Sequence, residues 1–257
     1  MKKDDQYWDK PWSLVDGCTP CSPGCERCWS AAIAWRFEKA PTPGEDAFTC
    51  QPGEEPPQYT GRVEFRHDRL GIPLKRKTPT VYSIWTDLFH EDIHQGAISD
   101  AFDVMGRCPQ HIFLVLTKRA KRMSEFLHMS HYPNVWLGVT VCNQAEAYEK
   151  IPLLLQTLAA HRYISVEPML GPIDLWQEST IDGGPKFGPQ PGIPHIAVDW
   201  VICGPETGAG KRPMDEAWAR SLYGQCLEAN VPFFSKGDLP GLPRELPFNL
   251  SERGEKT

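Results

Sequence analysis

Four of the nine cysteines in this 257-residue chain fall within one short stretch, at Cys18, Cys21, Cys25 and Cys28. Thiols at such close spacing are typical of a metal site. Two ligand sets are open, because C-x3-C-x2-C begins at Cys21 and C-x6-C-x2-C begins at Cys18. Either set brings three thiolates together in a single loop.

Three thiolates suit a cubane [4Fe-4S] cluster, because three ligated irons leave the fourth iron open for a substrate or cofactor. This is the arrangement of radical S-adenosylmethionine (SAM) enzymes. A zinc site that uses all four cysteines is the alternative, since four thiolates form closed structural zinc sites. Such sites usually take two C-x2-C pairs from separate segments, whereas here one loop would surround the ion. We therefore favour an iron–sulfur cluster over zinc and over unligated thiols.

The elements that position this loop are visible as hydrophobic patterns. A candidate strand at 12–16 leads into the loop, and a helix-like segment at 29–39 follows it. Further along, strand-length apolar runs alternate with helical segments, and continuous apolar runs are typical of parallel strands covered on both faces. The expected strands are 80–86, 111–117, 135–141, 163–166, 200–203 and 231–234. The expected helices are 97–108, 119–129, 144–158 and 215–230.

This repeated strand–helix order predicts an α/β fold, namely a partial (βα) barrel of about six to seven parallel strands. A doubly wound open sheet is the alternative. A single domain over residues 1–257 is the simpler organisation for a chain of this length. Loop-rich excursions are expected at 41–75 and at 171–198, where proline and glycine are frequent.

The composition limits the classes of partner. A net charge of −6 argues against strong non-specific attraction to phosphate backbones, although basic pieces occur at 75–77 and 118–122. No apolar run approaches the length of a membrane span, and the first residues lack a signal-peptide pattern. The cysteines form no even framework, so we expect reduced thiols and a cytoplasmic protein.

Polar residues gather where the predicted strands end. The carboxyl ends of parallel strands carry the site in α/β folds, so we expect these residues to share one mouth with the cysteine loop. They are Thr86, Asp87, Thr117, Lys118, Arg119, Thr140, Ser165, Glu167, Gly204, Glu206, Ser235 and Lys236. Solvated turns are the alternative, but they explain polar residues at so many successive strand ends less well.

Longer motifs accompany these residues. They are Gly17-Cys18, Ser22-Pro23-Gly24-Cys25 and Cys28, then 87–92, 116–119 and 134–139, and finally 165–173, 200–208 and 212–214. Together they resemble the phage Gp37/Gp68-type proteins, a family of unknown function related to the radical SAM barrel. Two departures concern the substrate. The family's Gly-Gly-Glu-Ser is Gly204-Pro205-Glu206-Thr207 here, and 237–240 replace the usual ending after the last strand's lysine.

The resemblance implies an enzyme with a [4Fe-4S] cluster, bound SAM and an external one-electron reductant. It favours Cys18, Cys25 and Cys28 as the cluster ligands, with Cys21 as a neighbour or exchange ligand. It also implies a set of cofactor-binding residues. Thr86 and Asp87 would lie near the methionine end of SAM, Ser165 and Glu167 near its ribose, and Gly204 and Glu206 near its adenine. Thr117 completes the set.

Lys118 and Lys236 are the expected catalytic residues. With Arg119, they are expected to face an anionic substrate, and a nucleotide or nucleic-acid base is the expected partner. A zinc-stabilised binding or adaptor protein without catalysis is the alternative function.

One further motif competes with this interpretation. His90-Glu91-Asp92-Ile93-His94 matches H-E-x-x-H, which on a helix would provide two zinc-binding imidazoles and a general base. The spacing offers no third ligand, and the family resemblance covers His90 to Asp92 but not His94. A metalloprotease is therefore disfavoured.

Overall fold

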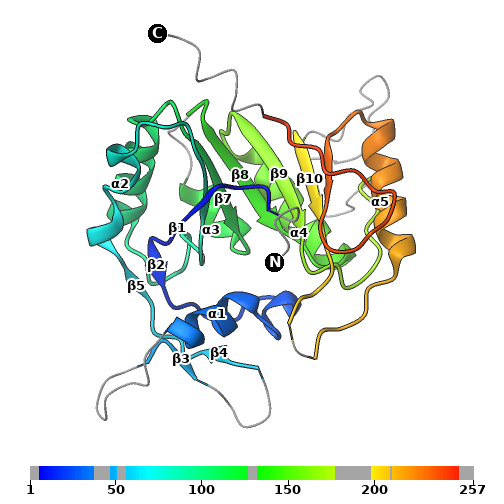
Figure 1. Ribbon diagram of the computed structural model, residues 1–257, viewed down its shortest axis with the longest axis horizontal. Helices are drawn as coiled ribbons and strands as arrows, with labels where there is room; N and C mark the ends of the chain where they lie inside the picture. Colours follow the sequence, from blue (N-terminus) through cyan, green and yellow to red (C-terminus); the bar gives the residue numbers. More distant parts are fainter. Residues whose placement is uncertain are drawn as a thin grey trace.

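The computed structural model describes residues 6–37, 47–50, 56–126, 132–176, 198–208 and 210–248. A seven-stranded, all-parallel sheet curls into a half-barrel, with helices between its strands (Figure 1). The predicted α/β partial barrel is thereby confirmed, and the open-sheet alternative is not adopted.

The seven strands lie side by side in chain order, β1-β6-β7-β8-β9-β10-β11. Their bounds are β1 Lys10–Trp12, β6 Val81–Ile84, β7 Ile112–Thr117, β8 Val135–Thr140, β9 His161–Val166, β10 Trp200–Cys203 and β11 Phe233–Ser235. Most of their residues are buried, as continuous apolar runs require in a sheet covered on both faces.

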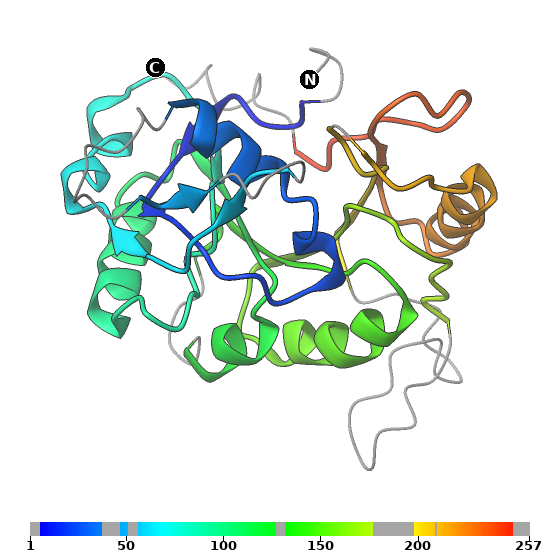
Figure 2. The ribbon, with the colours of Figure 1, turned by 90° about the horizontal axis from the view of Figure 1, so that it is seen from below.

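Helices cover the outer, convex face. They are α2 Gln95–Gly106, α3 Ala120–Phe126, α4 Gln144–Gln156 and α5 Glu216–Glu228. Seen from below, they form an arc around the sheet, with α1 (Trp29–Phe37) lying inside that arc (Figure 2). Side-chain caps begin three of them, since His94 accepts from the Gly96 amide, Asn143 from the Glu146 amide and Asp215 from the Ala217 amide.

Strand residues alternate between two cores. One set, which includes Phe113, Val115 and Ile164, packs outward against the helices. The intervening positions point to the concave inner face, where an apolar cluster forms. This cluster consists of Tyr7, Val81, Ile112, Leu114, Trp136, Tyr163, Trp200, Ile202 and Phe234.

One expectation about the N-terminal third is corrected. The strand expected at 12–16 is two short strands, β1 and β2 (Val15–Asp16), because the chain leaves the main sheet after Trp12 and β2 pairs with β5 (Glu64–Phe65) instead. The described part of the excursion expected at 41–75 contains short strands and turns. They are β3 Thr49–Cys50, β4 Gln58–Tyr59, β5, and the 3-10 turns η3 His67–Arg69 and η4 Pro73–Lys75.

Two other expected segments are described only in part. The excursion expected at 171–198 is described at 171–176 and at Val198, where neither a helix nor a strand occurs. The end of the helix expected at 119–129 likewise lies outside the described residues. The basic stretch at 75–77 begins in η4, and Lys75 and Arg76 line a groove of about 380 Å³ beside β1.

Candidate functional site

The cysteine loop connects β2 to α1 and is shaped by two glycines. Gly17 has φ +83°, and a Cβ there would overlap the carbonyl oxygen of Arg62. Gly24 lies in the 3-10 turn η2 (Pro23–Cys25), where a Cβ would lie 3.0 Å from Pro168 Cδ and would also crowd the Cys142 sulfur. Neither position has room for a side chain, so the loop runs close against the strand ends.

The four thiols differ in exposure. Cys25 is buried, Cys18 and Cys28 are half-buried, and Cys21 is exposed. The Cys21 thiol donates a hydrogen bond to the Cys25 sulfur, and this bond is the main reason why the pKa of Cys25 falls to about 5. Burial raises the pKa of Cys18 to about 11. Burial alone therefore fits the set Cys18, Cys25 and Cys28 better than a set that begins at Cys21.

Arg119 joins the loop to two strand ends and uses all five of its N–H groups. Its Nε donates to Glu91 (2.6 Å), and its Nη2 donates to both oxygens of Thr19 (2.8 and 3.0 Å). Its Nη1 donates to Asp87 (3.1 Å) and lies 3.8 Å from the Cys18 sulfur. The guanidinium thus has all its donors engaged within the protein, so an anionic substrate at Arg119, which stays a prediction, would have to compete with these contacts.

Asp87 is the buried carboxylate that receives Arg119. Its oxygens also accept from the Thr117 hydroxyl (2.6 Å), the Lys118 amide (3.1 Å) and the Phe89 amide (3.0 Å). The neighbouring Thr86 has φ +60°, and its hydroxyl donates to the Val15 carbonyl. These polar groups are engaged within the protein, so they hold the end of β6 against β7 and β2.

A second arginine fixes the other side of the loop. Arg212 donates from its backbone N and from Nε to Glu206 Oε2 (2.8 and 2.9 Å), and its Nη2 forms an ion pair with the other oxygen. The same guanidinium reaches the loop, donating to Glu26 (2.7 Å) and to the Pro23 carbonyl (3.0 Å). Burial would raise the pKa of Glu206, but the hydrogen bonds from Arg212 lower it overall.

Lys118 is half-buried beside the thiols. Burial alone would lower its pKa, but the charges of Cys25, Cys28, Cys142 and Asp87 keep it above the ordinary value. Cys142 follows β8 and was not predicted as a site residue, yet its sulfur lies 3.8 Å from the Ser22 hydroxyl of the loop. Lys118 is thus the one expected catalytic residue that lies among the cysteines.

The thiols are not arranged around one point. Within the described part of the chain, no three His, Cys, Asp or Glu side chains are grouped closely enough to hold a single metal ion. Sulfurs around one zinc lie roughly 3.8 Å apart, given Zn–S bonds of about 2.3 Å in a tetrahedron. A cubane cluster is wider than one ion, so its ligands stand further apart.

A second polar cluster lies at the ends of β9, β10 and β11. Lys236 Nζ forms an ion pair with Glu167 Oε1 (2.6 Å), and Glu167 Oε2 accepts from Ser165 (3.1 Å) and from the Tyr7 hydroxyl (3.4 Å). Gly204 makes room for this pair, because a Cβ there would lie 3.0 Å from Lys236 Cβ and 3.1 Å from Glu167 Oε1. Of the residues expected to contact the ribose, Glu167 therefore pairs with Lys236, and Ser165 donates to Glu167.

Three tryptophans from distant segments meet beside the loop. The rings of Trp8 and Trp85 are 6.0 Å apart and those of Trp85 and Trp29 are 5.3 Å apart, both edge to face. Trp29 directly follows Cys28 and is 49% exposed, while the other two are half-buried. Sequence reasoning did not select these residues as a group, because only the fold brings them together.

The H-E-x-x-H match does not form a zinc-binding helix. His94 caps the N-terminus of α2, so His90 precedes the helix. The His90 ring is buried and fully used, with its Nδ1 accepting from the Asp92 amide (3.1 Å) and its Nε2 2.8 Å from the Thr19 hydroxyl. This geometry removes the metalloprotease interpretation.

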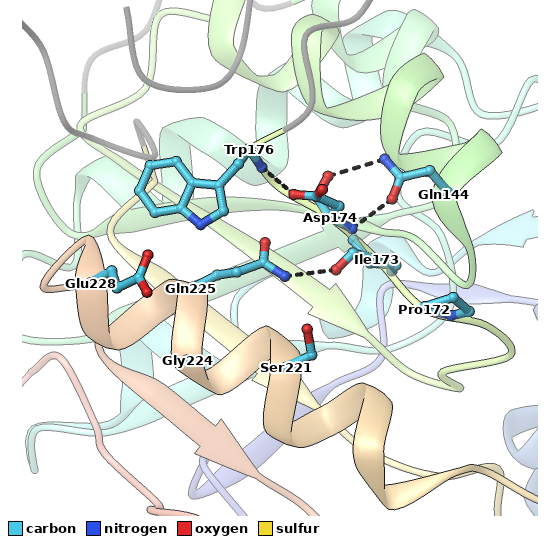
Figure 3. A pocket seen from close by; sticks show the side chains of 9 residues that line it. All are labelled: Gln144, Pro172, Ile173, Asp174, Trp176, Ser221, Gly224, Gln225 and Glu228. Carbon is cyan, nitrogen blue, oxygen red and sulfur yellow. Dashed lines mark hydrogen bonds between the residues drawn. The ribbon is translucent and has the colours of Figure 1, made fainter.

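A groove of about 560 Å³ lies between α5 and the segment that follows β9 (Figure 3). Its amides are occupied in holding that segment, since Gln144 Oε1 accepts from the Asp174 amide (2.6 Å) and Gln225 Nε2 donates to the Ile173 carbonyl (3.0 Å). None of the clustered cysteines or expected strand-end residues lines it. The groove is separate from the candidate site.

Comparison with known families gives a match that covers most of this chain. Residues 4–238 match the family described as "Protein of unknown function (DUF5131)". The chain belongs to the DUF5131 family. The matched region of this DUF5131 protein includes the cysteine loop and all seven strands of the main sheet. Comparison with curated proteins and comparison with solved structures gave no match.

No described helix of this DUF5131 protein combines the length and apolarity needed to cross a membrane.

The expected site residues divide into three groups at the carboxyl ends of the strands. Thr86, Asp87, Thr117 and Glu206 hold the loop; Lys118 stands with the thiols; and Ser165, Glu167, Gly204 and Lys236 form the separate cluster described above.

Proposed function

We propose that this DUF5131 protein is a radical SAM enzyme of the Gp37/Gp68 type. The observation that carries the proposal is the position of Cys18, Cys25 and Cys28. These thiols lie in one loop, at the carboxyl ends of a parallel half-barrel, beside the cations of Arg119 and Lys118. The carboxyl ends of strands are where α/β barrels carry their chemistry.

The donor set fits a [4Fe-4S] cluster. Three thiols are at least partly shielded from solvent, and adjacent cations suit a group whose thiolate ligands carry negative charge. A spread of thiols too wide for a single ion also agrees with a multi-iron cluster better than with zinc. Cys21 is the exposed neighbour and is not required in the ligand set.

When bound, the cluster would supply the electron for reductive cleavage of SAM to methionine and a deoxyadenosyl radical, and this radical would take a hydrogen atom from the substrate. The electron comes from an external reductant. The protein's own residues position and shield the site. Arg119 and Arg212 hold the loop on both sides, and Lys118 keeps a positive charge beside the sulfurs.

The test is anaerobic reconstitution of the full chain with iron and sulfide, followed by iron counting in single Cys→Ala variants. We expect Cys18→Ala, Cys25→Ala and Cys28→Ala each to lose most of the bound iron, because a cubane held by two thiolates is poorly retained. Cys21→Ala should keep it. Cys226→Ala, which removes a buried thiol on α5, is the matched control.

Catalysis is tested separately, with dithionite and SAM. Formation of deoxyadenosine by the reconstituted protein, and its loss in Cys25→Ala, would support the enzyme. A colourless protein that binds zinc stoichiometrically and forms no deoxyadenosine would instead favour the zinc-stabilised adaptor. Full iron retention in Cys18→Ala, with loss in Cys21→Ala, would move the first ligand to Cys21.

A further inference from the structure

The inner face of the half-barrel changes character along its strands. Near the amino ends it is apolar and aromatic, with Trp136, Tyr163 and Trp200 packed together. Positions of the same parity nearer the carboxyl ends are mostly small or polar, and alternate residues of a strand share one face. These are Thr140, Ser165, Glu167, Gly204 and Lys236, with Trp85 at the end of β6. A polar and aromatic zone thus lies between the apolar floor and the cysteine loop.

The Glu167–Lys236 pair has bonding capacity to spare. The two side chains retain 17% and 21% exposure, so both are accessible. A carboxylate offers about four acceptor positions, and Glu167 uses three of them, toward Lys236, Ser165 and Tyr7. An ammonium has three donors, of which Lys236 uses one in this ion pair. An acceptor and a donor therefore stand side by side.

Stabilisation of the fold does not readily explain why Glu167 and Lys236 form this ion pair. A partly buried ion pair loses hydration and often contributes little net stability. Gly204 is also required beside it, since any Cβ would crowd both partners. A pair maintained at this cost on an accessible inner face is better explained by recognition than by folding.

An aromatic row begins beside the pair, where Lys236 Nζ lies 5.3 Å from the centre of the Tyr7 ring. Tyr7 and Trp8 are consecutive, and Tyr7 contacts Glu167 while Trp8 contacts Trp85. Trp29 continues this row to the surface beside the cysteine loop. Exposed tryptophan faces bind flat rings by stacking, and base–aromatic stacking does not depend on base identity.

From these two features we infer that the substrate of the proposed reaction is a nucleobase. The tryptophans would stack on its ring, while Glu167 accepts from an N–H and Lys236 donates to the adjacent C=O on its edge. The inference rests on the proposed function for its site. A free nucleoside and a base within a single strand share this chemistry, and the experiment separates the two sources.

The test is isothermal titration calorimetry of the full protein, with and without SAM, using uridine, 3-methyluridine and a short single-stranded oligouridine. The 3-methyl group removes the N–H that Glu167 would accept. We expect uridine to bind at least about tenfold more tightly than 3-methyluridine, as one good pair of edge contacts provides. Tight binding by the oligonucleotide alone would identify a base within a strand as the source.

Variants separate recognition from stability. Glu167→Leu, which removes both acceptor oxygens, should bring uridine and 3-methyluridine within about twofold of each other, while Glu216→Leu, in an exposed pair on α5, should leave the difference intact. Trp29→Ala should weaken binding about tenfold. Trp35→Ala, which removes a similarly exposed tryptophan from the same helix, should not. Circular dichroism checks folding.

Several results would overturn the inference. They are the absence of binding by every ligand, equal binding of uridine and its 3-methyl analogue to the unmodified protein, or equal losses in Trp29→Ala and Trp35→Ala. The titrations require neither iron nor reductant. A protein that binds uridine without forming deoxyadenosine would therefore refute the radical chemistry alone, and the opposite result would refute only the nucleobase.

Discussion

Single residues determine the path of the cysteine loop. Gly17 turns the chain with a positive φ and passes against the Arg62 carbonyl, so a side chain at this position meets both strain and overlap. Arg119 then contacts the loop at Thr19 and Cys18, while its other N–H groups donate to carboxylates. The geometry of the thiols thus depends on residues that would not themselves bind the proposed cluster.

We predict that Gly17→Ala lowers the free energy of unfolding by at least about 2 kcal/mol, because left-handed backbone strain and a steric clash add together. Urea denaturation monitored by circular dichroism measures the change. Gly71→Ala is the control, since a Cβ at that position would have nothing within 4 Å and no positive φ is found there. Equal stability of the Gly17 and Gly71 variants would show that the loop adapts to a side chain.

At the scale of elements, the loops that follow the strands hold the cysteine loop from two sides. The β7–α3 connection contributes Arg119, and the segment after β10 contributes Glu206 and Arg212. On the second side, the link is an ion pair between a buried carboxylate and a guanidinium that also reaches Glu26 and Pro23. This link should therefore depend on pH.

We predict that Arg212→Met destabilises the protein by about 3 kcal/mol at pH 7, because it leaves Glu206 buried without its partner. The pKa of Glu206 is lowered in the folded protein, so its stabilising contribution is present above about pH 4.5 and is lost as the pH falls below it. The stability gap between the unmodified protein and the variant should therefore narrow in acid.

Urea titrations at pH 7 and pH 4 measure that gap. Arg220→Met, which removes an exposed i,i+4 pair on α5, is the control and should cost less than about 1 kcal/mol at both pH values. A gap that stays constant between the two pH values would show that Arg212 acts through packing or through Glu26 rather than through Glu206.

At the scale of the whole molecule, the half-barrel has two edge strands, β1 and β11, that do not pair with each other. The N-terminal segment crosses the concave face between them (Figure 1). Tyr7 fixes this segment, since its buried ring packs edge to face on Trp200 and Phe234 and its hydroxyl reaches Glu167. The N-terminal segment thus contributes a buried aromatic ring to the inner core of the half-barrel.

We predict that Tyr7→Ala lowers the free energy of unfolding by about 3 kcal/mol, as loss of a buried aromatic ring does. Tyr7→Phe keeps the ring and should cost about 1 kcal/mol, the value of one hydrogen bond. Thermal denaturation followed by near-UV circular dichroism measures both. If Tyr7→Ala were as stable as Tyr7→Phe, the segment would not contribute to the core.

Much of the fold was predictable because its signals are local. The later strands and helices match the expected ranges within a few residues, since continuous apolar runs and caps act on neighbouring positions. The strand expected at 12–16 failed for the opposite reason. Whether such a short run joins the main sheet or pairs with β5 depends on partners far along the chain.

The site divides in the same way. The sequence by itself determined the cysteine loop, the strand ends and the polar residues beside them, because spacing and parity are properties of one chain segment. Only the tertiary structure decided that Arg119 is fully engaged, that Glu167 pairs with Lys236, and that three tryptophans meet beside the thiols. Hydrogen bonds and ring contacts join segments whose separation in sequence carries no information about their distance in space.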